Sequence, residues 1–165
     1  MLIVLSGLPG SGKTTLARAL VTRIPAVHLR LDTVEQALVD SGVEEHPVGA
    51  AGHHVLRAVA RDLLRQGLTV VADGVNPLSV TRELWRAVAQ DAGVRFRDVE
   101  VVCPDPQLHR SRVENRVGDV VGLPLPTWEQ VRNWGFDPWD GERVRIDSSR
   151  TTPEQAARDL LPALS

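Results

Sequence analysis

Residues 2–15 read LIVLSGLPGSGKTT, and this stretch decides the fold of the chain. Residues 7–14 match G-x-x-x-x-G-K-[ST], the phosphate-binding P-loop, whose backbone N–H groups surround the phosphates of a nucleotide. The continuous apolar run before the loop is typical of a buried parallel strand, and apolar residues at helical spacing follow it. A strand, a glycine-rich loop and a helix in this order aim several N–H groups at one anion. The stretch therefore predicts a phosphate-binding site.

Lys13 supports this interpretation because it is the only lysine among the 19 lysine and arginine residues of the chain. Arginine is a planar fork, whereas lysine is a compact ammonium on a thin stem that fits inside a loop wrapped around a phosphate. We predict that Lys13 acts in catalysis and that the Thr14 hydroxyl binds Mg²⁺. The predicted nucleotide-binding residues are Gly7, Pro9, Gly10, Ser11, Gly12, Lys13, Thr14 and Thr15.

The composition is that of an ordinary globular protein. At 165 residues, with 42% hydrophobic residues, the chain fits one domain with an adequate core. A net charge of −2 disfavours nucleic acid as a partner. A lone cysteine, Cys103, excludes an internal disulfide, and no zinc-ligand spacing is present. Met1 runs almost directly into the loop without a signal peptide, and no apolar stretch is long enough to span a membrane. We expect a cytoplasmic protein.

Strand and helix patterns alternate along the rest of the chain. Apolar runs predict strands at 26–31, 68–72, 99–103 and 144–147. Helices are predicted at about 48–66, from Asn76-Pro77 to about 92, from Asp105-Pro106 through Arg116, and from Thr152 onward. Such alternation predicts an α/β fold with a parallel sheet covered on both faces. We expect residues 1–165 to form a single domain, interrupted only by a long connection at about 117–142, in which residues 127–130 are expected to start a short helix.

Two aspartates are predicted where strands end, and ligands gather at the carboxyl ends of strands in an open α/β sheet. Asp73 ends an apolar strand and is predicted to bind Mg²⁺ together with Thr14; its alternative role is that of a turn residue before Gly74. Asp32 ends the neighbouring strand and is predicted to accept the proton of a substrate hydroxyl. Its alternative role is to cap a helix that begins at Thr33.

Arginines precede the long connection. Arg112 and Arg116, and less strongly Arg110, are predicted to neutralise the charge of a transferred phosphoryl group when a mobile lid closes. The helix at 48–66 is expected to place Val55, Leu56, Val59, Leu63 and Leu64 on one face, toward the core, and Arg57, Arg61 and Arg65 on the other. His53 and His54, adjacent on this helix, point about 100° apart, so that one of them faces the cleft or the core.

These features resemble the small P-loop kinases, a group that includes chloramphenicol phosphotransferase, gluconate kinase, adenylylsulfate kinase and the kinase domain of polynucleotide kinase. The resemblance spans the chain and rests on the G-x-P-G-S-G-K-T-T loop, the two aspartates and the R-x-x-x-R of residues 112–116. It implies a three-layer P-loop NTPase sandwich with strand order 2-3-1-4-5, a lid between strands 4 and 5, and ATP with Mg²⁺. Asp32 then matches the general base, and Arg112 and Arg116 match lid arginines. Residues 31–35 resemble the adenylylsulfate kinase segment only loosely, without that family's aspartate-asparagine pair and following arginine, which disfavours sulfate activation.

The sequence thus predicts an ATP-dependent kinase that phosphorylates a hydroxyl of a small molecule, such as a natural product, an antibiotic or a sugar. The acceptor is expected between Asp32 and His54. One alternative is a polynucleotide or nucleoside kinase, which the absence of a basic groove disfavours. Another is a non-catalytic nucleotide switch or a regulatory ATPase. The sequence indicates no oligomeric state.

Overall fold

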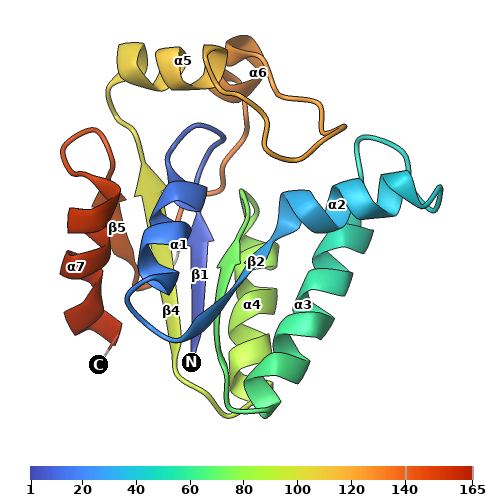
Figure 1. The fold of residues 1–165 in the computed structure, drawn as a ribbon, viewed down its shortest axis with the longest axis vertical. Coiled ribbons are helices and arrows are strands. Elements are labelled where there is room, and N and C mark those ends of the chain that lie inside the picture. Colours follow the sequence, from blue (N-terminus) through green and yellow to red (C-terminus); the bar gives the residue numbers. More distant parts are fainter. Residues whose placement is uncertain (140, 165) are drawn as a thin grey trace.

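The computed structural model describes residues 1–139 and 141–164, and within them a single parallel sheet carries the fold (Figure 1). The strands are β1 (Leu2–Ser6), β2 (Ala26–Arg30), β3 (Thr69–Asp73), β4 (Phe96–Val102) and β5 (Val144–Asp147). The helices are α1 (Lys13–Val21), α2 (Leu31–Asp40), α3 (Ala50–Arg65), α4 (Ser79–Asp91), α5 (Pro106–Glu114), α6 (Trp128–Arg132) and α7 (Pro153–Leu164). The strand order is β2-β3-β1-β4-β5, which confirms the prediction.

The strand β1 divides the core into two halves. It is buried along its whole length, and its side chains point alternately to the two faces of the sheet. Ile3 and Leu5 pack in one core cluster with α1 and α7, whereas Leu2 and Val4 pack in a second cluster with α3 and α4. Helices therefore cover both faces, as Figure 1 shows, and the predicted three-layer sandwich is confirmed. No helix among the described residues is long and apolar enough to cross a membrane.

The helix α2 begins earlier than the sequence predicts. Leu31 is only 6% exposed and packs in the second core cluster, so the chain enters the helix directly after Arg30. Asp32 consequently lies in the first turn of α2, not at the end of a strand. The alternative role of Asp32 as a helix cap is therefore wrong, because Arg30 occupies the N-cap and no side chain caps this helix.

The face that α3 turns to the core is only partly the predicted one: Leu56, Leu63 and Leu64 pack in the core as expected, but Val55, Val59 and Arg57 do not follow the prediction. Val55 and Val59 are 41% and 43% exposed, whereas Arg57 is buried. The buried row instead runs through Gly52, Leu56, Ala60 and Leu64, which are spaced four residues apart. The small residues Gly52 and Ala60 in this row let α3 pack closely against its neighbours, and this shifts the buried stripe away from Val55 and Val59.

Above the carboxyl edge of the sheet lie α5 and α6 (Figure 1). Because α5 ends at Glu114, Arg116 follows the helix and does not belong to it, contrary to the prediction. It starts the connection to β5, and we call residues 115–139 the lid segment. Within the lid segment α6 begins with a capping box in which Thr127 and Gln130 each bond the other's backbone N–H. The short helix expected there is confirmed.

Asn76 fastens the turn after β3. It has a left-handed φ of 47° and is 2% exposed. Its Nδ2 donates to the hydroxyl of Ser6 at 3.2 Å, and its Oδ1 accepts a hydrogen bond from Trp85 Nε1 at 3.2 Å. Since these bonds need a non-helical backbone, α4 begins at Ser79 and not at Pro77, where the sequence places it.

Replacing Asn76 with alanine should destabilise the protein by about 3 kcal/mol. The change leaves the buried Trp85 N–H without an acceptor, and an unpaired buried polar group costs about 1–3 kcal/mol. It also keeps a strained φ in a residue that favours it less than asparagine does. Urea unfolding measures the loss, and Asn76→Ala, Trp85→Phe and the double variant together form a thermodynamic cycle. Additive losses in that cycle would show that the Asn76–Trp85 hydrogen bond contributes nothing.

Candidate functional site

The P-loop has a backbone that only glycine fits at its key positions. Gly10 and Gly12 have φ values of +79° and +98°. A Cβ at Gly7 would lie 2.2 Å from the backbone oxygen of Val101, and a Cβ at Gly10 would lie 2.7 Å from Val113 Cγ2. The loop is therefore pressed against β4 and α5, in the shape that lets successive N–H groups converge on an anion.

His109 supports the same loop from α5. It is 7% exposed, and its Nε2 donates a hydrogen bond of 2.8 Å to the backbone oxygen of Pro9. On its other side the ring meets Trp128 of α6 edge-on, with the ring centroids 5.3 Å apart. The P-loop, α5 and the lid segment are thereby joined through one imidazole, a contact that no local sequence pattern signals.

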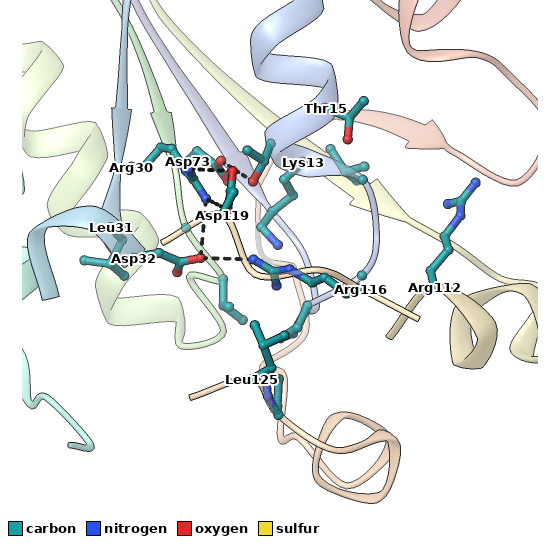
Figure 2. Close-up of a pocket in the computed structure, with 18 of the residues that line it drawn as sticks. Lys13, Thr15, Arg30, Leu31, Asp32, Asp73, Arg112, Arg116, Asp119 and Leu125 are labelled. Atoms are coloured by element: carbon teal, nitrogen blue, oxygen red, sulfur yellow. Dashed lines mark hydrogen bonds and ion pairs between the residues drawn. The ribbon is translucent and has the colours of Figure 1, made fainter. Parts of the chain in front are cut away.

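Lys13 points from the loop toward the carboxyl edge of the sheet. Its side chain is nearly buried, and its Nζ donates to the backbone oxygen of Leu8 at 3.1 Å. Burial lowers the pKa of Lys13, while the charges of Asp73 and Asp32 oppose that change. Figure 2 shows the Lys13 ammonium facing the space between these two carboxylates.

Asp73 and Thr14 meet as the sequence predicts. The Thr14 hydroxyl donates to Asp73 Oδ2 at 2.7 Å, and His28 Nε2 lies 3.3 Å from the same oxygen. Burial raises the pKa of Asp73, but the hydrogen bond from His28, the charge of Lys13 and the Thr14 bond outweigh it and leave the pKa below its usual range. An ionised carboxylate beside a hydroxyl is the oxygen chemistry that Mg²⁺ prefers, so these residues fit the predicted metal.

Asp32 faces Lys13 from α2 and contacts an arginine of the lid segment (Figure 2). Its Oδ2 lies 3.6 Å from Arg116 and 4.0 Å from Arg30. The side chain is 33% exposed, so its free lone pairs remain accessible from the cavity. The proton acceptor and one lid arginine predicted from the sequence are thus brought together as an ion pair.

Asp119 ties the lid segment to the body of the protein, and the sequence analysis missed it. Both of its carboxylate oxygens accept hydrogen bonds of 3.0 Å from Arg30, and Arg18 of α1 bonds it as well. These hydrogen bonds and charges hold the pKa of Asp119 well below its usual range. Its partners lie 89 and 101 residues away in the sequence, so only the fold reveals them.

Arg110 and Arg112 have different surroundings. Arg112 donates to the hydroxyl of Ser148 at 2.8 Å and to the Ser148 backbone oxygen at 3.0 Å, which places it where β5 ends. Figure 2 shows it on the far side of the P-loop from Asp32. Arg110 pairs with Glu114 on the exposed side of α5 and does not line the cavity.

A cavity of about 1300 Å³ extends from the P-loop across the end of the sheet to α2 and α3. Its lining includes Lys13, Thr14, Thr15, Asp32, Asp73, Arg112 and Arg116, and also Gly10, Gly12 and Pro9. Gly7 and Ser11 lie instead beside a smaller cavity of about 460 Å³ behind the loop, next to Cys103 and Trp139. The structure therefore collects most of the predicted site residues around one space large enough for two substrates.

Three titratable side chains line the region of this cavity between Asp32 and His54. They are Glu35 from α2, His46 from the loop between α2 and α3, and His53 from α3. His53 is the histidine that faces the cleft, since His54 is exposed. Burial, and then the charges of Arg57 and His54, lower the pKa of His53. Burial, and then the charge of Asp32, raise the pKa of Glu35 to about 7.

Replacing Glu35 with glutamine should stabilise the protein at pH 8 by about 1–2 kcal/mol, after allowance for the solvent screening of a partly exposed side chain. The pKa of Glu35 is about 7 in the folded state and 4.5 in the reference state, so the unfolded chain loses this proton first. Stability falls as the pH rises from 4.5 to 7 and then stays low. The variant lacks this loss.

Urea unfolding of wild type and Glu35→Gln at pH 5 and pH 8 measures the difference. The exposed Glu83 on α4 is the matched control, because Glu83→Gln removes the same charge outside the cavity. An equal effect of Glu35→Gln at both pH values would contradict the expected titration.

Known proteins share both the sequence pattern and the fold. A family model described as an AAA domain matches residues 2–134. A probable adenylyl-sulfate kinase of Aeropyrum pernix is 25% identical over 171 residues, which cover 93% of this chain and 86% of the relative.

Two solved structures share the fold along nearly the whole chain. The first is the APS kinase of Mycobacterium tuberculosis in complex with AMPPNP and APS, with a TM-score of 0.73 and 21% identity over 99% of this chain and 96% of that one. The second is a gluconokinase from Sinorhizobium meliloti, with a TM-score of 0.67 and 18% identity over 98% of this chain and 91% of that one. The resemblance to the small P-loop kinases is confirmed, and the chain belongs to the AAA domain family.

Proposed function

We propose that this protein is an ATP- and Mg²⁺-dependent kinase that transfers the γ-phosphoryl group to a hydroxyl of a small molecule. We further propose that residues 1–165 act as a single kinase domain with a lid at about 117–142. The observation that carries the proposal is the meeting of Lys13, Asp73 and Asp32 beside one cavity. This reaction needs a cation beside the phosphates, a ligand for the metal ion and a proton acceptor for the hydroxyl, all at one place. Lys13, Asp73 and Asp32 would supply them in that order.

The P-loop binds and orients the triphosphate in this proposal. Its backbone N–H groups and the N-terminus of α1 face the anion. Lys13 adds a charge that is already buried and fixed before the substrate arrives, so little reorganisation is required during transfer. The Thr14 hydroxyl and the Asp73 carboxylate would hold Mg²⁺, which neutralises charge that develops on the phosphate oxygens.

Asp32 receives the acceptor hydroxyl. A carboxylate is only an acceptor of hydrogen bonds, so it can orient the hydroxyl and take its proton as the new bond forms. In the structure Arg116 neutralises Asp32. When the phosphates enter, Arg116 has a second anion within reach, and its move from the carboxylate to the transferred group would leave Asp32 free for the acceptor. Arg112, held near the end of β5 by Ser148, would contact the nucleotide side of the site.

In this proposal the acceptor occupies the region of the cavity toward α2 and α3. The size of this region suits a small molecule. The lid segment adds apolar side chains to the lining of the cavity, among them Leu123, Leu125 and Trp134. The cavity is bounded by the lid segment, which Asp119 fastens to Arg18 and Arg30. Measured ATP consumption with sugars, nucleosides, adenylyl sulfate and oligonucleotides separates this proposal from a polynucleotide kinase and from a non-catalytic switch.

Lys13→Ala should fold normally and lose about 10²–10³-fold in turnover, the usual effect of removing a preorganised charge next to a developing one. Circular dichroism checks the fold, and a coupled assay of ADP release measures the rate. Near-normal turnover in a folded variant would overturn the proposed role of the P-loop.

Asp32→Asn should keep ATP binding, because the P-loop, Thr14 and Asp73 are unchanged. Acceptor phosphorylation should fall by roughly 10²–10⁴-fold, with the lower end favoured because the loose transition state releases the proton late. ATP affinity and acceptor turnover are measured side by side, with the exposed Asp62→Asn on α3 as the matched control. A parallel loss of ATP affinity would assign Asp32 to the nucleotide and not to the acceptor.

A further inference from the structure

The wall of the cavity formed by α2 and α3 carries a carboxyl group that the proposed reaction does not use. Glu35 lies three residues after Asp32 on α2, so the two side chains share one face of the helix. Both line the cavity. Among the described residues, no ion pair or hydrogen bond joins the Glu35 carboxylate to a partner.

Packing between α2 and α3 holds Glu35 in this position. A Cβ at Gly52 of α3 would lie 2.6 Å from Glu35 Cγ and 3.4 Å from Glu35 Oε1. The stem of the glutamate thus fills the space that the glycine leaves open, and any other residue at position 52 would displace it. This contact with Gly52 restricts the Glu35 side chain and holds its carboxylate at a fixed place in the cavity.

Within residues 1–139 and 141–164, no arginine, lysine or histidine forms an ion pair with this carboxylate. Arg30 is bound by both oxygens of Asp119, and Arg116 pairs with Asp32. His46 Nε2 lies 3.0 Å from the Gln36 side-chain oxygen, and burial keeps the pKa of His53 below its ordinary value. Two carboxylates side by side in a partly buried wall repel each other, and Glu35 is the one left unneutralised.

Glu35 also lies about one turn farther along α2 than Asp32, and α2 runs away from the P-loop (Figure 1). Asp32 lies in the first turn of α2, where it pairs with Arg116 of the lid segment. Asp32 is therefore the carboxylate placed for the reacting hydroxyl, and Glu35 is placed for another part of the same molecule.

We propose that Glu35 binds a positively charged nitrogen of the acceptor, so that the acceptor is an alcohol that also carries an amine. This inference rests on the proposed function and names the class of its substrate. The hydroxyl lies at Asp32 and the ammonium at Glu35, with a separation of roughly 5–6 Å if it follows the spacing of Cβ atoms three residues apart on a helix. An ammonium bound there supplies the positive charge that the Glu35 carboxylate lacks. It also makes a charge-assisted hydrogen bond to this carboxylate, which is partly shielded from water.

The test compares compounds of one skeleton and different charge. Calorimetry at pH 8, with AMPPNP and Mg²⁺ present, measures the binding of glucosamine, glucose and gluconate, and of 4-aminobutan-1-ol, butane-1,4-diol and 4-hydroxybutanoate. The amine of at least one trio should bind wild type at least tenfold more tightly than its neutral and acidic counterparts. Glu35→Gln should lose roughly ten- to a hundredfold of that affinity, the usual effect of a hydrogen bond to a charged group, while Glu83→Gln should lose none. Glu35→Asp keeps the charge on a shorter stem, and its affinity for the amine should lie between those of wild type and Glu35→Gln.

Binding of a neutral or acidic compound as tight as that of its amine would overturn the inference. Equal amine binding by wild type and Glu35→Gln, or no amine binding at all, would do the same. AMPPNP affinity is measured first in every variant. If AMPPNP fails to bind wild type, the proposed kinase function fails. If AMPPNP binds and the amines show no preference, only the assignment of Glu35 fails.

Discussion

The hydrogen bond between Thr14 and Asp73 joins the two parts of the chain on which everything else depends. Thr14 belongs to the first turn of α1, and Asp73 ends β3, 59 residues later. The bond forms only because β1 and β3 are neighbours in a parallel sheet, with Leu5 opposite Asp73. This register brings the phosphate loop and the predicted metal carboxylate to the same edge. A shift of one residue in the register would turn the carboxylate into the opposite face of the sheet.

Charge balance governs the space around that bond. Arg18, Arg30 and Arg116 reach the cavity, and each is paired with Asp119 or Asp32 in the structure. A triphosphate brings negative charge that competes for the same arginines. Substrate binding and the position of the lid segment are therefore linked through a limited number of cations. Glu35 stands outside this exchange, and this is why it requires a different explanation from the other carboxylates.

The sequence was sufficient for the sheet order and the phosphate loop, because both follow from local patterns and from the resemblance built on them. It failed at α2, where the burial of Leu31 against α3 outweighed the strand-like run before it. It also failed to find Asp119 and Glu35. The role of Asp119 depends on partners about 90–100 residues away, and the place of Glu35 depends on a gap left by Gly52 in another helix. Contacts of this kind leave no periodic signal in one sequence.

The edge-on contact of His109 with Trp128 gives the protein a natural optical probe. His109 bonds the backbone of Pro9 in the P-loop, and its ring touches an indole carried by α6 of the lid segment. Any adjustment of the loop around a ligand changes the surroundings of a fluorophore that lies outside the cavity lining. In a variant that carries phenylalanine in place of the other three tryptophans, nucleotide binding can thus be followed through the emission of Trp128, without attaching a label to the chain.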